Sequence, residues 1–438
     1  MTKYSVSNLF YEGGFLMENL VEAKKHILII GTSNYSSKLS EIQSTIRTSV
    51  ICRASELPFL HRAHCHESII VMKDDSTPEM WIEYAKNLNS LNPIHHVSSF
   101  EELDQDKACA IASALNIQFH HPSTIDWVNN KYKMRKRLEA LQFEEIPCEL
   151  IQSVEEIKTF ASKIGYPLIL KPSKGKASTG ISVIYTEDDI EEAMEFSESA
   201  AAPRLDYSTL MVEPLLVGQE FSVEVISENG EHFMIGIVEK HVDQDSKVEI
   251  GHVFPADLPI HIENKIKEYT FKFLDALNIE YGITHTDIIY TIDGPKIIET
   301  QLRPPSDKLP ELIYDSIGID CIQYLVEQEA GISIKEKLVN HLDSVNEERK
   351  TSAIWYSFVN FDGVLETIQN KDEIKNMEGV AEFSQLISDG IHVSKLKSSY
   401  SRIAFVRTIH SHADQALLTA QKAIKNLLMF LSVRGIVR

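Results

Sequence analysis

The chain has 438 residues, 43% of them hydrophobic, and a formal net charge of −21. This length is sufficient for two or three domains with their own cores, and the negative charge argues against a nucleic-acid partner, which would require a broad basic face. The apolar runs are too short to span a bilayer, no signal peptide is recognisable, and five scattered cysteines suit a reducing compartment. We therefore expect a cytoplasmic protein without a membrane or nucleic-acid partner. A small anionic ligand bound by a few lysines remains compatible with the acidic charge of the whole chain.

The first 122 residues are predicted to form an α/β domain. Residues 26–33, HILIIGTS, have the pattern of a buried strand ending in glycine, and later apolar runs such as SIIVM alternate with helical stretches. This alternation is typical of a parallel sheet covered by helices. Only Gly31 stands where a dinucleotide-binding fingerprint requires three spaced glycines, so we do not expect NAD to bind here.

A small polar loop between two predicted strands, residues 167–172 and 181–185, is the first candidate binding feature. A helix precedes it, with Ser153 and Glu156 as a capping box and Gly165 as its stop. Lys171 ends the first strand, and small residues such as Ser178 would let backbone N–H groups approach an anion. The spacing does not match a P-loop. The residues alone leave open whether the loop binds phosphate or is an ordinary hairpin turn.

The rest of the chain adds further strands and a terminal helix. Residues 209–227 predict two strands joined near Gly218, and the polar run 340–352 predicts a connector. Residues 412–431 are predicted as a helix that Ser411 and Asp414 could start. We divide the chain into an N-terminal domain (1–122), a central domain (123–335) and a C-terminal domain (336–438).

Residues 281–307, YGITHTDIIYTIDGPKIIETQLRPPSD, predict a hairpin with chemistry on one face. A three-residue loop, 292–294, with Gly294 in the left-handed position, would make Thr291 oppose Pro295 and Asp287 oppose Glu299. The same count places His285, Gln301 and Arg303 on that face. A two-residue turn would instead separate Asp287 from Glu299, so the prediction depends on the register.

This polar face predicts a site for a divalent cation. Oxygen atoms of Asp287, Glu299 and Gln301 suit Mg²⁺, which usually completes its octahedron with water and nucleotide phosphates. The alternative is a solvent-facing polar side of the hairpin, with Arg303 paired to Glu299.

From about residue 26 onward these motifs resemble the ATP-grasp superfamily. The resemblance implies an N-terminal Rossmann-like α/β domain (1–122), an ATP-grasp domain (123–335) with a mobile α+β lid at about 147–207, and a C-terminal α+β domain (336–438), with ATP bound under the lid. It further implies that Arg303 stabilises the transferring phosphoryl group, and that ATP and Mg²⁺ (or Mn²⁺) are bound by Lys131, Lys171 and Ser178 at the phosphates, Glu213 and Leu216 at adenine, Glu220 at ribose, and Asp287, Glu299 and Gln301 at the metal. Asp287 replaces the more usual Glu, Gln301 replaces Asn, and Pro305 and Ser306 stand where a glycine pair is common.

Within that superfamily, THTD, VEIGHVFPADLP and the C-terminal region most resemble L-amino-acid ligases. This resemblance implies an ADP-forming ligase that activates one amino acid as an acyl phosphate and joins it to a second, and a homodimer would agree with it. His285 or His252 could assist the attacking amine or orient a substrate carboxylate, and Glu249 could receive an ammonium group. Two alternatives stay open: another ATP-grasp ligase, of a purine or cofactor pathway, and an ATP-binding regulator without turnover.

Overall fold

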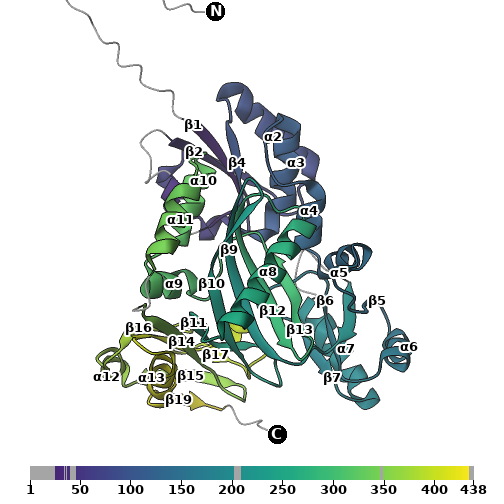
Figure 1. The fold of residues 1–438 in the computed structure, drawn as a ribbon, viewed down its shortest axis with the longest axis vertical. Helices are drawn as coiled ribbons and strands as arrows, with labels where there is room; N and C mark the ends of the chain where they lie inside the picture. Colours follow the sequence, from purple (N-terminus) through teal and green to yellow (C-terminus); the bar gives the residue numbers. More distant parts are fainter. Residues whose placement is uncertain are drawn as a thin grey trace, which may run out of the picture.

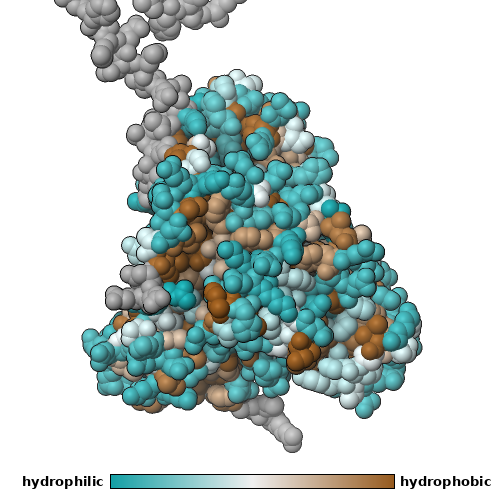
Figure 2. Space-filling model, viewed as in Figure 1, coloured by the Kyte–Doolittle hydropathy of each residue, from teal (hydrophilic) through white to brown (hydrophobic). Residues whose placement is uncertain are grey.

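The computed structural model describes residues 25–33, 35, 37–39, 46–201, 209–345 and 349–433. Four sheets organise these residues: a parallel sheet at the top of Figure 1, an eight-stranded sheet through the centre, a four-stranded sheet at the lower right and a three-stranded sheet at the lower left. Helices cover them, which confirms the predicted α/β class. The face in Figure 2 is mainly hydrophilic, with its hydrophobic residues in small separate groups.

The N-terminal sheet is parallel, as predicted, with the strand order β3-β2-β1-β4. Trp81, Ala85 and Ile111 from its helices pack against Leu28 and Ile30. The chain leaves β1 for β2 on one side and reaches β4 on the other, so the carboxyl ends of β1 and β4 border a topological switch point, where open α/β sheets commonly bind ligands. Its elements are β1 (Lys25–Ile30), β2 (Ile46–Arg53), η1 (Leu57–Phe59), η2 (Ala63–Cys65), β3 (Ser68–Met72), α2 (Pro78–Leu91), β4 (His96–Ser98), η3 (Glu102–Asp104) and α3 (Gln105–Leu115).

A four-stranded antiparallel sheet, in the order β5-β8-β6-β7, forms the region predicted as a lid. Ile157, Phe160 and Leu168 lie in its core. The Ser153 side chain accepts a hydrogen bond from the Glu156 backbone N–H, as predicted, and Gly165 ends the helix. The predicted capping box is only half formed, because the Glu156 carboxylate accepts a 2.7 Å hydrogen bond from the Gln152 N–H and not from Ser153. This region and the helices before it comprise α4 (Pro122–Val128), α5 (Lys131–Ala140), β5 (Glu149–Ile151), α6 (Val154–Ile164), β6 (Leu168–Pro172), β7 (Ser182–Ile184), η4 (Glu187–Asp189), α7 (Ile190–Ala201) and β8 (Leu210–Pro214).

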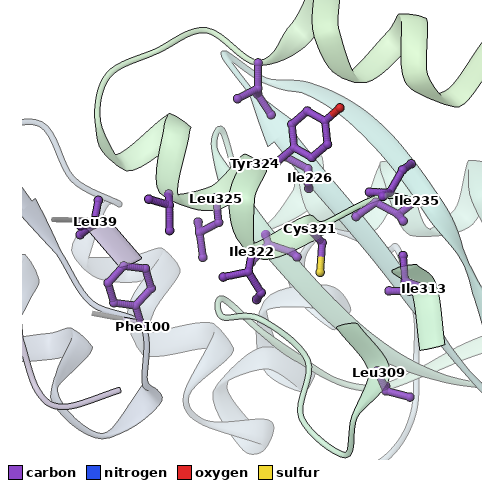
Figure 3. Close-up of a cluster of buried hydrophobic side chains, with 14 of the residues drawn as sticks. Leu39, Phe100, Ile226, Ile235, Leu309, Ile313, Cys321, Ile322, Tyr324 and Leu325 are labelled. Carbon is purple, nitrogen blue, oxygen red and sulfur yellow. The ribbon is translucent and has the colours of Figure 1, made fainter. Parts of the chain in front are cut away.

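The central sheet is antiparallel, in the order β13-β12-β9-β10-β11-β14-β18-β16. Val225 and Ile226 are neighbours in β9 and face opposite sides, so Val225 packs with Phe273 of α8 while Ile226 packs under α9 and α10. Figure 3 shows the cluster that contains Ile226, in which Leu39 and Phe100 lie beside α10. The elements are β9 (Gln219–Glu228), β10 (Glu231–Val242), β11 (Glu249–Phe254), α8 (Ile260–Ala276), β12 (Gly282–Thr291), β13 (Gly294–Gln301), α9 (Leu309–Ile317), α10 (Cys321–Glu329), α11 (Lys335–Ser344), β14 (Thr351–Ser357), β16 (Val380–Gln385) and β18 (Ala404–His410).

The C-terminal region corrects two predictions. The predicted helix over 412–431 ends at Lys425, and residues 428–432 form a strand, because Leu428 and Phe430 alternate with less exposed neighbours beside β15. Part of the predicted connector is helical, since α11 continues to Ser344, and residues 346–348 lie outside the described residues. The remaining elements are β15 (Gly363–Gln369), α12 (Lys371–Lys375), β17 (His392–Val393), η5 (Ser399–Ser401), α13 (Ala413–Lys425) and β19 (Leu428–Ser432).

Strands β14, β16 and β18, from the region predicted as a C-terminal domain, continue the sheet of β9–β13. The predicted domain boundaries after residues 122 and 335 stay a proposal. None of the helices in the described part of the chain has the length and apolar character that a membrane span requires.

Candidate active site

A cavity of about 590 Å³ lies between the four-stranded sheet, the β12–β13 hairpin and the start of α9. Every residue that the sequence predicted for the site lines this cavity, although they come from positions 131 to 303 of the chain. They are Lys131, Lys171, Ser178, Glu213, Leu216, Glu220, Glu249, His252, His285, Asp287, Glu299, Gln301 and Arg303.

The β12–β13 hairpin places Asp287 opposite Glu299, as predicted, but by a different route. Thr291 pairs with Gly294, so the turn has two residues and the predicted three-residue loop is wrong. A bulge restores the register: Ile288 pairs with Ile297, Asp287 pairs with Glu299, and Ile298 is the extra residue. The bulge therefore compensates for the shorter turn and keeps both carboxylates on one face.

Asp287 lies between two cationic side chains. Its Oδ1 atom is 2.8 Å from Nζ of Lys240 and 3.3 Å from Nε2 of His285. Burial alone would raise the pKa of Asp287, but Lys240 and His285 hold it well below its usual value. Lys240, which also lies 3.0 Å from Glu249, was missed by the sequence prediction. No motif pointed to Lys240, because β10 reaches β12 only through their shared neighbour β9.

Glu299 is held by its neighbours in a similar way. Its Oε2 atom is 2.6 Å from Nζ of Lys131, and its Oε1 atom accepts a hydrogen bond of 2.6 Å from the Gln301 amide. The Gln301 Oε1 atom is buried and has no hydrogen-bond partner among the described residues. Together with Asp287, these groups form an oxygen-rich donor set that fits a hard cation such as Mg²⁺.

This donor set suits a metal shared with a ligand. Within the described ranges, no group of three or more His, Cys, Asp or Glu side chains is arranged to hold a metal ion alone. Mg²⁺ is usually bound by one or two carboxylates together with substrate phosphates. The residues present therefore fit a cation that arrives with a nucleotide.

Lys171 belongs to a buried ionic network. Its Nζ atom is 2.6 Å from Oε1 of Glu213, and the other carboxylate oxygen lies 2.9 Å from Nε of Arg135. Arg135 also binds Glu144 at 2.8 Å. Burial acts to raise the pKa of Glu213, but the two cations lower it to about 2. The Glu213 side chain thus fixes Lys171 at the end of β6.

Replacing Glu213 with glutamine should lower the free energy of unfolding by about 3 kcal/mol at pH 7, because a buried cation loses its partner. The wild-type advantage should be present above pH 4.5 and disappear as the pH falls through about 2, where the native carboxylate is protonated. Urea unfolding of the wild type and the variant across this pH range measures the difference in their free energies of unfolding. Glu149→Gln, which removes an exposed pair with Lys163, is the matched control and should change stability by less than about 1 kcal/mol. Equal losses in the two variants would contradict the prediction.

The loop after Lys171 joins an antiparallel pair of strands, since Leu168 pairs with Ile184. Ala177 and Ser178 have positive φ angles of 59° and 53°. The Lys131 ammonium donates a 3.1 Å hydrogen bond to the Gly175 carbonyl, and the Ser399 N–H donates one of 3.2 Å to the Ala177 carbonyl. The loop is therefore a hairpin connection that also borders the cavity, and its phosphate-binding role stays a prediction.

Arg303 is oriented by the segment that follows β4. Its Nε atom donates a 2.7 Å hydrogen bond to Glu102, and Nη1 donates to the Pro304 carbonyl at 2.9 Å. The alternative in which Arg303 pairs with Glu299 is not what the structure shows. Glu102 was missed because 201 residues separate it from Arg303.

Two more titratable groups, Glu220 and His285, have pKa values above their usual ones. Burial raises the pKa of Glu220 to about 7. His285 is buried, which disfavours its charged form, but Glu224, with Oε1 2.7 Å from Nδ1, and Asp287 raise its pKa to about 10. We therefore expect His285 to be an imidazolium at neutral pH.

The C-terminal region supplies one wall of the cavity. Arg402 binds both carboxylate oxygens of Asp307, at 2.7 and 2.8 Å, and its guanidinium lies 3.9 Å from the Tyr356 ring centre. His252 approaches the same carboxylate at 3.4 Å. The sequence prediction missed Asp307 and Arg402, because 95 residues separate them and no motif links them.

Comparisons with known proteins agree with this geometry. Residues 164–305 match the model of the ATP-grasp domain, and residues 356–429 match L-amino acid ligase C-terminal domain 2. The crystal structure of an L-amino acid ligase from Bacillus licheniformis superposes with a TM-score of 0.77 and 18% identity, covering 94% of this chain and 100% of that one. The chain thus has an ATP-grasp fold, and the two domain matches confirm the predicted resemblance to ATP-grasp ligases.

Within this class, the second domain match confirms the resemblance to L-amino-acid ligases. An L-arginine-specific L-amino acid ligase of Bacillus subtilis is 22% identical over 377 residues, 83% of this chain and 86% of that protein. The carbamoyl phosphate synthase large chain of Pseudomonas syringae is 23% identical over 221 residues, but the match covers only 49% of this chain and 20% of that protein.

Proposed function

We propose that the chain is an ATP-dependent carboxylate–amine ligase that joins two amino acids through an acyl phosphate and releases ADP and phosphate. The observation that supports this best is the convergence of three cations, Lys131, Lys171 and Arg303, with the Asp287–Glu299 pair in one cavity. The C-terminal domain match to L-amino acid ligases supports the choice of amino acids as substrates.

In this proposal ATP lies between the hairpin loop after β6 and the central sheet. Lys131, Lys171 and the loop at Ser178 face its phosphates, Glu213 and Leu216 mark the strand beside adenine, and Glu220 meets the ribose. A pKa of about 7 lets Glu220 exchange hydrogen bonds with ribose hydroxyls in either protonation state.

Mg²⁺ or Mn²⁺ would be held by Asp287, Glu299 and Gln301, and when bound it neutralises charge on the outer phosphates. The residues of the chain then align the reactants. A substrate carboxylate attacks the γ-phosphorus, the bond to the bridging oxygen breaks, and ADP leaves with the electron pair. Arg303 neutralises the charge on the transferring phosphoryl group and then on the acyl phosphate.

The second step is attack by a neutral amine on the acyl carbon. The C–N bond forms from the nitrogen lone pair, and phosphate leaves with the electrons of the broken C–O bond. His252 and Glu249 lie at the wall of the cavity that Arg402 and Asp307 complete, which supports a role in holding the substrates. The pKa of about 10 makes His285 a poor base, so we propose that it orients Asp287.

The His285 ring should stay protonated throughout the neutral range and lose its proton only near pH 10. An NMR titration of the histidine ring nitrogens measures this directly. In Glu224→Gln the titration should move to lower pH, because one of the two carboxylates that stabilise the imidazolium is removed. A wild-type midpoint near the usual value of about 6.5 would contradict the assignment.

The proposed function is tested by ADP release in the presence of Mg²⁺, ATP and mixtures of amino acids, with mass spectrometry of the products. We expect ADP release that depends on a particular pair and a product of the mass of a dipeptide. Dependence on a different carboxylate would indicate another ATP-grasp ligase, and nucleotide binding without ADP release would indicate a regulator. A homodimer and a cytoplasmic location stay predictions.

A further inference from the structure

A second cavity opens beside the first, toward the N-terminal domain. It has a volume of about 1260 Å³ and extends along α3 and α4. The two cavities share a short boundary, where both are lined by Ser33, Glu101, Lys131, Gly175, Lys176, Glu299, Gln301 and Tyr400. A substrate approaching from the second cavity therefore meets the proposed metal face at this boundary.

Glu101 lies at the topological switch point of the N-terminal sheet. It follows the carboxyl end of β4, and Ser33 follows the carboxyl end of the neighbouring parallel strand β1. Open α/β sheets commonly bind ligands in the crevice at such a point. Glu101 is also the neighbour of Glu102, which holds Arg303 at 2.7 Å.

The Glu101 carboxylate makes no hydrogen bond or ion pair with any described residue. Burial raises its pKa, and the positive charges of Arg303 and Lys176 only partly oppose that effect. A half-buried carboxylate without a partner is costly, and a cationic ligand would remove that cost.

With one exception, the other carboxylates of the first cavity are each paired with a cationic side chain. Each is within about 3 Å of a lysine or arginine nitrogen: Glu213, Glu249, Asp287, Glu299, Asp307 and Glu311. The exception is Glu220, which lies at the start of β9 where the ribose is proposed. Two carboxylates, Glu101 and Glu299, line the boundary that the two cavities share, and Glu299 is paired with Lys131. Of these two, Glu101 is therefore the one that has no cationic partner among the described residues and can bind a substrate there.

We propose that Glu101 binds the ammonium group of the amine substrate and accepts its proton before the C–N bond forms. This inference rests on the proposed function. The ammonium gives one proton to the carboxylate, and the nitrogen lone pair attacks the acyl carbon. The C–O bond to phosphate then breaks, and the departing phosphate takes the second proton. Lys176 lies at the same boundary and offers a partner for a substrate carboxylate. Glu101 and Lys176 together therefore suit an amine substrate that is a zwitterionic amino acid.

Hydroxylamine separates the two steps of the reaction. It is largely unprotonated at neutral pH, so it captures an acyl phosphate as a hydroxamate without needing a protein base. In Glu101→Gln we expect hydroxamate formation within about twofold of wild type. Amide formation with an amino acid as the amine should fall by about 10²-fold or more, the usual contribution of a positioned base. Both products can be measured in parallel with ADP release.

Two variants complete the experiment. Glu56→Gln removes a negative charge from the second cavity and should leave both reactions unchanged. Glu102→Gln should reduce both reactions, because Arg303 loses its hydrogen-bond partner. The inference is overturned if Glu101→Gln makes the amide as fast as wild type, or if it loses both products equally. If the wild-type chain forms no hydroxamate with any proteinogenic amino acid, the proposed function fails, and this inference fails with it.

Discussion

Replacing Glu299 with glutamine should weaken binding of Mn²⁺ in the presence of a non-hydrolysable ATP analogue by about 10²-fold. Loss of a residue that only orients a ligand already costs 10 to 100-fold in metal affinity, so loss of a ligand should reach the upper end of that range. In the structure this carboxylate contacts Lys131 at 2.6 Å and Gln301 at 2.6 Å. Electron paramagnetic resonance of free and bound Mn²⁺ measures the affinity without relying on turnover.

The matched control for Glu299 is Glu311→Gln. Glu311 also lines the cavity, but it pairs with Lys308 at 3.0 Å and has no role in the proposed metal site. This variant should bind Mn²⁺ and nucleotide like wild type. Equal affinities in the Glu299 variant and wild type would remove this carboxylate from the metal site.

Replacing Arg303 with methionine should lower kcat by about 10²-fold, which corresponds to about 3 kcal/mol of lost transition-state stabilisation. Arg303 is held in place by Glu102 at 2.7 Å, so its charge is positioned before the phosphoryl group moves. Nucleotide affinity should change little, because Lys131 and Lys171 remain. Steady-state rates and nucleotide titrations separate the two effects.

Arg303→Lys provides the comparison for Arg303→Met. Lysine retains the charge but not the planar guanidinium that binds Glu102, so its rate should lie between those of wild type and the methionine variant. A methionine variant with wild-type kcat would show that Arg303 does not act on the transferring group.

The sequence predicted the positions of the site residues where a single local pattern determined them. Asp287, His285, Glu299 and Gln301 lie on two strands that are adjacent in the chain, and the period of two residues decides which side chains share a face. The turn itself was mispredicted, because Gly294 was assigned to the loop. The bulge at Ile298 cancelled that error in the register, and no residue pattern in the strand announces such a bulge.

The remaining groups of the site come from long-range packing. Lys240 pairs with Asp287 only because β10 and β12 both flank β9. Arg402 reaches Asp307 only because β14 and β18 extend the central sheet. The end of α13 shows a different limit: Leu428 and Phe430 fit a helix or a strand by composition, and pairing with β15 decides between them.

The most direct test of the central claim, acyl-phosphate formation at the Asp287–Glu299 face, follows an oxygen atom. The activated amino acid is supplied with ¹⁸O in its carboxylate, and the released phosphate is examined by mass spectrometry. Because the carboxylate oxygen attacks phosphorus and stays with it when the amine displaces phosphate, we expect one ¹⁸O atom in each phosphate. Unlabelled phosphate, released at the same rate with or without amino acids, would contradict the account.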